Sequence, residues 1–145
     1  MTSSTVDANV LVYTTDRNSP FHDAARVLVE QLALGPELVY LFWPVVLAYL
    51  RIATHPVIAN TPLSSAEAEA NVAQFLDVPH VRVVGEQDQF WANYRVIAND
   101  VRPTGNLVPD AHLVALMREN EVRAIWTHDR DFRKFKGIEV RDPFR

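Results

Sequence analysis

Short apolar runs alternate along this chain with longer stretches of helical periodicity, and this alternation constrains the fold more than any other feature. Strands separated by helices pair in parallel, because the crossover between them has room for a helix that then covers the sheet. The pattern therefore predicts an α/β fold with a mainly parallel sheet. We interpret the runs 4–6, 81–84, 124–126 and 138–140 as strands, and 38–42 as either strand or loop.

Helix signals fill much of the sequence between these runs. Pro44 suits the first position of a helix, because its fixed φ is helical and the N–H that it lacks has no partner there. Residues Ser64 to Glu67 form a capping-box pattern, in which the serine and the glutamate each satisfy a free backbone N–H. The expected helices span residues 20–34, 44–54, 64–76, 87–99 and 110–120.

The composition bounds the class of protein. With 145 residues, 48% of them hydrophobic, and no repeat or linker, the chain is expected to form one globular domain over residues 1–145. It contains no cysteine, which excludes disulfides, cysteine-based zinc sites and thiol nucleophiles. No apolar run reaches about 18 residues, and the first residues lack the pattern of a secretory signal. We therefore expect a cytoplasmic protein without a membrane span.

Three aspartates stand where an α/β fold collects functional groups. Asp7 follows the first predicted strand, Asp129 follows the strand at 124–126, and Asp110 opens a predicted helix. In open α/β sheets such groups gather beyond the carboxyl ends of the strands, so the three could be neighbours. Each also has a simpler interpretation: Asp7 and Asp110 could cap helices, and Asp129 with Asp131 could form a solvated turn.

A cluster of carboxylates fits one kind of chemistry well. Mg²⁺ prefers carboxylate and water oxygens and is usually held by one or two carboxylates together with substrate phosphate. Crowded acids repel each other, and a bound cation relieves that repulsion. The net charge of −4 argues against a passive nucleic-acid binder, but not against a nuclease whose metal restores the attraction to phosphate.

Four motifs, in order along nearly the whole chain, give these aspartates a context. They are VDANVLVY, FWPVVLAYLRIATHP, GNLVPDAHLVAL and IWTHDRDFRKFKGIEV. With them the sequence resembles the PIN-domain ribonucleases, most closely the toxin component of VapBC-type toxin–antitoxin systems.

The resemblance implies a fold, a cofactor and a set of site residues. The fold would be a PIN-like three-layer α/β/α sandwich, and the cofactor Mg²⁺, with Mn²⁺ as an alternative. Metal ligands would be Asp7, Asp110 and Asp129, and Asp131 would join them as a further catalytic acid. The activity would be hydrolysis of phosphodiester bonds in RNA, with tRNA or rRNA as substrate.

One position departs from the family pattern. These toxins usually carry a glutamate in the helix after the tryptophan, and its place here corresponds to Ala48. Residues 38–66 contain no acid at all, so no neighbour replaces it. The gap brings a second metal ion into doubt and leaves open a catalytically weakened domain that binds RNA or a partner without efficient cleavage.

Several other residues have both a functional and a structural interpretation. Asn9 and Thr127 could orient the acids by hydrogen bonds or simply stabilise turns. Arg51 could position RNA phosphates together with His55, or the two could form a solvated surface pair. His112 would lie on a different helix face from Asp110 and is expected to be structural.

The resemblance also implies two protein partners, a second copy of this chain and an antitoxin. The large aromatic residues, by contrast, are expected to lie mostly in the core; they are Phe42, Trp43, Phe90, Trp91 and Tyr94. An aspartyl-phosphate phosphotransfer protein is a weaker alternative, because Asn9 stands where the haloacid dehalogenase pattern needs a second aspartate.

Overall fold

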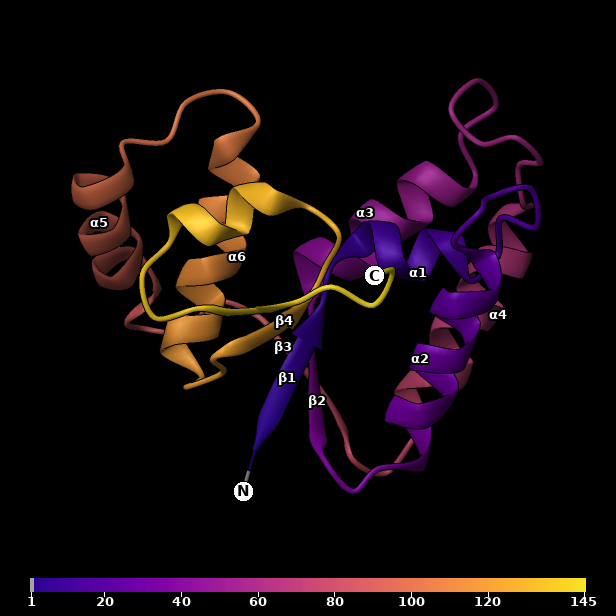
Figure 1. Ribbon diagram of the computed structural model, residues 1–145, viewed down its shortest axis with the longest axis horizontal. Coiled ribbons are helices and arrows are strands. Elements are labelled where there is room, and N and C mark those ends of the chain that lie inside the picture. Colours follow the sequence, from indigo (N-terminus) through magenta and orange to yellow (C-terminus); the bar gives the residue numbers. More distant parts are fainter. Residues whose placement is uncertain (1) are drawn as a thin grey trace.

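Five parallel strands form the centre of the protein in the computed structural model, which describes residues 2–145 (Figure 1). Their order across the sheet is β3-β2-β1-β4-β5, and all four pairings are parallel, as predicted. Residues 38–42 form an interior strand that pairs with both neighbours. The strands are β1 (Ser3–Val6), β2 (Leu38–Phe42), β3 (Val81–Val84), β4 (Ala124–Trp126) and β5 (Glu139–Arg141).

Helices cover both faces of the sheet, which confirms the expected three layers (Figure 1). One layer contains α1 (Ala8–Tyr13), α2 (His22–Leu34), α3 (Trp43–Ala53) and α4 (Ser65–Leu76). The opposite layer contains α5 (Phe90–Val101), α6 (Leu107–Glu119) and the short 3₁₀ helix η1 (Arg130–Lys134). Among residues 2–145 no helix is long and apolar enough to cross a membrane.

The starts of the expected helices differ from the sequence prediction by one to three residues, and two of them differ by three. The helix expected at 87–99 begins at Phe90, and the one expected at 110–120 begins at Leu107. Asp110 therefore lies inside the first turn of α6 instead of starting it. The reason is Pro109, which suggested a boundary but is tolerated in a first turn, where the backbone N–H groups have no partner within the helix.

Two large core clusters lie on opposite faces of the sheet, and a third, smaller one of Tyr49, Ala53 and Ala68 joins α3 to α4. On the α6 side, Phe42, Met117 and Phe132 are almost completely buried, and on the α2 side Leu32 and Leu41 are. Each such side chain contributes about 1.5–3 kcal/mol by leaving water.

The expectation that the aromatic residues are core is wrong for both tryptophans. Trp43 is 45% and Trp91 is 62% exposed, whereas Phe90 and Tyr94 are partly buried. Apolar composition alone does not decide the side of a helix on which a residue lies. Trp91 stacks on Tyr94 at a ring distance of 5.6 Å, and this pair covers part of the surface of α5.

Candidate active site

The chain reverses its direction of travel across the sheet between β1 and β4. From β1 it proceeds to β2 and then β3, and α5 and α6 then carry it back to β4 on the other side of β1. Ligands and functional groups of open α/β sheets gather beyond the carboxyl ends of the strands at such a switch point. Asp7 directly follows β1 and Thr127 directly follows β4, so both lie at this position.

Two hydrogen bonds join these strand ends. The backbone N–H of Asp7 donates to the carbonyl of Trp126 at 3.0 Å, and the Thr127 hydroxyl donates to Oδ2 of Asp7 at 2.9 Å. Asp7 occupies the N-cap position of α1, but its side chain makes no capping hydrogen bond. Thr127 is therefore the main hydrogen-bond partner of the Asp7 carboxylate, and the backbone N–H groups of Ala8 and Asn9 at the start of α1 also act to lower its pKa.

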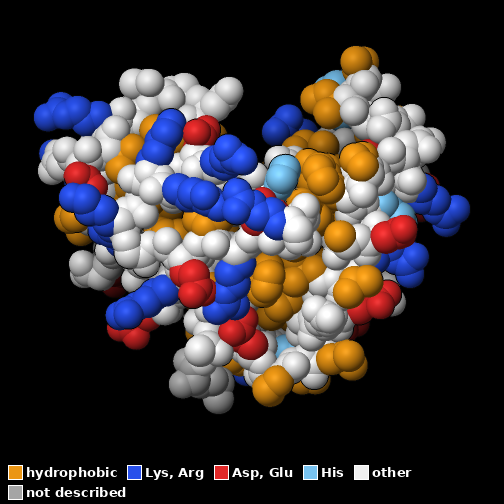
Figure 2. Space-filling view, viewed as in Figure 1, with side chains coloured by type: hydrophobic (Ala, Val, Ile, Leu, Met, Phe, Trp, Pro, Cys, Tyr) orange, Lys and Arg blue, Asp and Glu red, His pale blue; other side chains and the backbone are white. Residues whose placement is uncertain are grey.

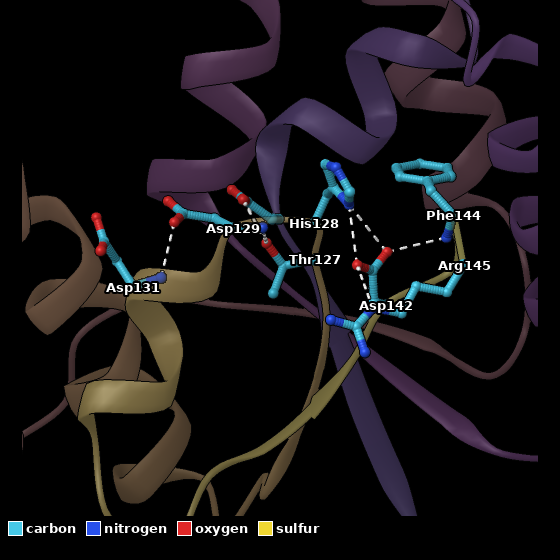
Figure 3. A network of polar contacts seen from close by, with 8 residues as sticks. Thr127, His128, Asp129, Asp131, Asp142, Phe144 and Arg145 are labelled. Atoms are coloured by element: carbon cyan, nitrogen blue, oxygen red, sulfur yellow. Dashed lines mark hydrogen bonds and ion pairs between the residues drawn. The ribbon is translucent and has the colours of Figure 1, made fainter.

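The loop after β4 continues this network (Figure 3). The Thr127 oxygen accepts the backbone N–H of Asp129 at 3.0 Å, and Oδ1 of Asp129 accepts the backbone N–H of Asp131 at 2.9 Å. Asp129 thus caps η1, and the turn that the sequence offered as the simpler interpretation of Asp129 and Asp131 is present. We call the series Asp7–Thr127–Asp129–Asp131 the acidic chain.

Three carboxylates come close enough together to share a cation. Asp110, Asp129 and Asp131 each offer one oxygen, and these oxygens all lie within 4.8 Å of one another. Asp7 is outside this compact group, although its negative charge raises the pKa of Asp110. The structure therefore places Asp131 beside Asp110 and Asp129, and Asp7 behind them at the end of β1.

The acids perturb one another strongly. The pKa of Asp110 is raised to about 7, first by burial and then by the negative charges of Asp129, Asp7 and Asp131. Burial also raises the pKa of Asp7, opposed by the hydrogen bond from Thr127. An ionised group surrounded by like charges gains from a nearby cation. One such cation is Lys134, whose Nζ lies 3.2 Å from Oδ1 of Asp131 and whose charge lowers the pKa of Asp110.

The donor set fits a hard divalent cation. Every group in it is a carboxylate oxygen, the ligand type that Mg²⁺ and Mn²⁺ prefer. Burial is the main cause of the raised pKa values of Asp7 and Asp110, and the charges of the neighbouring acids, which a divalent ion would offset, raise them further. Zinc sites rich in histidine or cysteine have a different composition. The acidic group can therefore hold a metal ion.

The remaining residues singled out from the sequence lie around this centre. Thr127 is fully buried and bonded to Asp7, whereas Asn9 is exposed on α1. Arg51 is exposed in the last turn of α3, and no hydrogen bond or ion pair within residues 2–145 joins it to the acids. Ala48 packs against the core cluster that contains Ala8 and Ala111, the residues after Asp7 and Asp110.

Both additional histidines make structural contacts. His55 Nδ1 accepts the backbone N–H groups of Val57 and Ile58, so it stabilises the turn after α3. His112 Nε2 lies 2.6 Å from Oε1 of Glu86. Its ring also packs edge-on against Phe90, which agrees with the structural role expected for it.

Sequence reasoning missed two features of the site. Lys134 contacts Asp131 three residues earlier, a spacing that brings the two together on one turn of η1. His128 contacts Asp142, which follows β5. The position of Asp142 directly after a strand-like run is the signal that could have revealed it, since Asp7 and Asp129 were found by the same rule.

Comparisons with known proteins agree with this architecture. The PIN domain family model matches residues 5–138. The chain is 58% identical over 142 residues to Ribonuclease VapC48 of Mycobacterium tuberculosis, covering 98% of both chains. It is 33% identical over 139 residues to Ribonuclease VapC43 of the same organism, covering 95% of this chain and 93% of the relative. Among solved structures, the DNA-bound VapBC of Salmonella typhimurium superimposes with a TM-score of 0.69 at 14% identity and covers 99% of both chains.

The fold and site define an α/β protein with a carboxylate centre at the switch point of a parallel sheet. With the family match over most of its length, this chain belongs to the PIN domain family.

Proposed function

We propose that this protein is a metal-dependent endoribonuclease that acts as the toxin of a toxin–antitoxin pair. The observation that carries the proposal is the gathering of Asp110, Asp129 and Asp131 in front of Asp7, in a chain 58% identical to a ribonuclease. Residues 1–145 form a single PIN-like domain in this proposal, and structured RNA such as tRNA or rRNA is the substrate.

Mg²⁺ is the proposed ion, with Mn²⁺ able to replace it. Asp7, Asp110 and Asp129 are its proposed ligands. Asp131, which lies beside Asp110 and Asp129, is the further catalytic acid of the proposal. When bound, the ion supplies a water of lowered pKa and neutralises charge on the phosphate under attack. Thr127 orients the carboxylate of Asp7 through its hydrogen bond, and Asp129 fixes the start of η1 through the backbone N–H of Asp131.

Basic side chains beside the acids would bind the RNA backbone. In Figure 2, Lys and Arg side chains gather over the η1 side of a hollow in the surface, and η1 itself contains Arg130, Arg133 and Lys134. Arg51 is exposed on α3, the helix that begins at the carboxyl end of β2. Local positive charge of this kind attracts phosphates even when the whole chain is acidic.

A homodimer and an antitoxin are the proposed protein partners. Trp43 and Leu47 are 45% and 60% exposed on one side of α3, and exposed apolar side chains of this size favour a protein contact. The crystal structure of VapBC2 from Rickettsia felis, bound to a DNA fragment from the promoter, has the same fold, with a TM-score of 0.68. Its 13% identity supports the fold only.

The decisive experiment is cleavage of a mixture of tRNA and rRNA with Mg²⁺ or Mn²⁺. Metal-dependent cleavage should be present in the natural protein and lost in both Asp7→Ala and Asp110→Ala. Asp23→Ala is the matched control, because Asp23 is an exposed acid in the first turn of α2, as Asp110 is in the first turn of α6. Cleavage that survives both active-site substitutions would overturn the proposal.

A second candidate is a weakened domain that binds RNA or a partner without efficient cleavage. Ala48 favours it, because residues 38–66 offer no acid at the usual glutamate position. Ala48→Glu would add a carboxylate beside the cluster of Ala8 and Ala111. Increased metal affinity and cleavage in this variant support a weakened site, whereas unchanged values show that four aspartates are sufficient.

A further inference from the structure

The loop after β4, residues 127–129, makes a second polar contact on its side away from η1. Asp142 comes directly after β5, at the same edge of the sheet as Asp7 and Thr127. Nδ1 of His128 lies 3.1 Å from its Oδ1 and 2.9 Å from its Oδ2 (Figure 3). An ionised carboxylate only accepts hydrogen bonds, so Nδ1 of His128 carries the proton. The Asp142 side chain is 10% exposed and the His128 side chain is 47% exposed, so the contact joins a largely buried carboxylate to a ring at the protein surface.

The same carboxylate organises the residues that follow it. Oδ1 of Asp142 accepts the backbone N–H of Phe144 at 2.9 Å, and Nε of Arg145 lies 3.7 Å from Oδ2. Asp142 therefore ties residues 142–145 into a turn and fastens that turn to His128. We call residues 142–145 the anchoring segment.

Aromatic packing supports the contact. Phe144 stacks on Phe21 with ring centroids 4.5 Å apart. The His128 ring lies 4.9 Å from Phe21 and 5.6 Å from Phe144, so both phenylalanines flank it. Tyr13 packs on the same two phenylalanine rings at 5.3 and 5.5 Å. Such aromatic pairs stabilise a packed cluster beyond the burial of their surface.

His128 connects this cluster to the acids through the chain itself. It stands between Thr127, which holds Asp7, and Asp129, which caps η1. The loop is thus fixed on one side by the acidic chain and on the other by the anchoring segment. Neither His128 nor Asp142 belongs to the group of Asp110, Asp129 and Asp131 that could hold a cation.

We propose that the anchoring segment, through the His128–Asp142 contact and the aromatic packing around it, positions Asp129 for metal binding. His128 and Asp142 are positioning residues that act through the backbone of the loop. The inference rests on the proposed function, because it assigns them a part in holding the metal of that site. Substitution of a residue that orients a metal ligand typically lowers metal affinity by about 10- to 100-fold.

The test measures Mn²⁺ affinity by calorimetry on the whole protein without RNA. His128→Phe keeps a ring against Phe21 but removes the hydrogen bond, and Asp142→Ala removes its acceptor. Both should weaken Mn²⁺ binding about tenfold, the lower end of the range for such residues. His128→Asn keeps a side-chain donor near the position of Nδ1, and its Mn²⁺ affinity should stay closer to that of the natural protein than to that of His128→Phe.

Two further variants separate positioning from general stability. Arg26→Ala removes only an exposed ion pair with Glu30 within α2, outside the anchoring segment, and Mn²⁺ affinity should not change. Val81→Ala removes buried volume from β3 at the far edge of the sheet, so its melting temperature should fall while its Mn²⁺ affinity is kept. RNA cleavage by His128→Phe should recover at high Mn²⁺, since the lost step is metal binding.

Each outcome decides between this inference and the proposed function. Equal Mn²⁺ affinity in the natural protein, His128→Phe and Asp142→Ala would overturn the inference and leave the proposed nuclease intact. Equal losses in Val81→Ala would also overturn it, because the effect would then follow stability. A natural protein that binds no Mn²⁺ would overturn both.

Discussion

Asp7 and Asp131 lie at opposite ends of the acidic chain and differ in how firmly the protein holds them. Asp7 accepts a hydrogen bond from Thr127, whose side chain is fully buried, and lies against the backbone of β4. Asp131 has a side chain that is 52% exposed and pairs with Lys134, which is 57% exposed. The inner acid is fixed by contacts with the sheet, whereas the outer acid pairs with an exposed lysine.

The difference teaches how one site combines rigidity with adaptability. A buried hydroxyl fixes a carboxylate with little freedom, and the burial that accompanies it raises the pKa of Asp7. An exposed ion pair contributes little stability and is screened by salt, so Asp131 can change partners at low cost. We expect substitutions at the inner end to have larger effects than those at the outer end.

The largest expected effect on RNA cleavage comes from neutralising Asp7 and Asp131, the two ends of the acidic chain, one at a time. Asp7→Asn should lower RNA cleavage at least about a hundredfold, a typical loss when a preorganised charged group is removed from a site. Asp131→Asn should lower it about tenfold, within the range for outer partners of a metal site. Metal-dependent cleavage rates of the two purified variants check the order. Equal losses would break the distinction between the ends.

The next effect tests what fixes the inner end. Thr127→Val removes the buried hydroxyl that donates to Asp7 and accepts from the N–H of Asp129. Leaving such groups without a partner costs about 1–3 kcal/mol, so the free energy of unfolding and the affinity for Mg²⁺ should both fall. Thr127→Ser keeps the hydroxyl and should lose much less. Denaturant unfolding and calorimetry measure the two quantities.

The pH dependence of stability tests the repulsion among the acids. The pKa of Asp110 is about 7 in the folded protein, against an ordinary value of 3.8. The folded state therefore retains a proton that the unfolded state has lost, and this stabilisation disappears as the pH rises from about 4 to about 7. Without divalent ions the melting temperature should fall over this range. Mg²⁺ should protect more at pH 8 than at pH 5, because its ligands must be ionised.

Asp110→Asn provides the control for that measurement. Its amide does not titrate, so the part of the pH dependence due to Asp110 should disappear. If the melting temperatures of this variant and of the natural protein depend on pH in the same way, the raised pKa of Asp110 is contradicted.

The smallest expected effect concerns the partner of the outer end. Lys134→Gln removes the cation beside Asp131, and Lys136→Gln is matched to it because Lys136 pairs with Asp100 on α5 instead. Each exposed pair contributes at most about 1 kcal/mol to stability, so both variants should unfold like the natural protein. Only Lys134→Gln should raise the KM for RNA, by a fewfold, and its effect should shrink at high salt. Equal KM values for the two variants would remove Lys134 from the site.

Much of the architecture was predictable from the sequence because it depends on local patterns. The alternation of apolar runs and helical stretches gave the α/β class and the parallel sheet, and the capping box at Ser64 and Glu67 forms as expected. Asp7 and Asp129 were found by their positions after strands. These features are local, since backbone propensity and side-chain periodicity act over a few residues.

The tertiary structure decided how the acids are arranged. The reversal of the chain between β1 and β4 brings Thr127 to Asp7 across 120 positions of sequence, and no local pattern encodes that distance. The packing of the elements also placed Asp131 within the compact group of carboxylates, and Asp7 outside it. The two exposed tryptophans show the same limit, because packing of whole elements selects the buried side of a helix.

The sequence by itself therefore determined the class of fold, the acids and their chemistry. Only the tertiary structure decided which acids lie close enough to share a cation, which hydroxyl donates to Asp7, and that Asp142 contacts both His128 and the backbone of Phe144. The physical reason is that contacts between residues far apart in the chain arise when elements pack, and their geometry depends on all the surfaces that pack together.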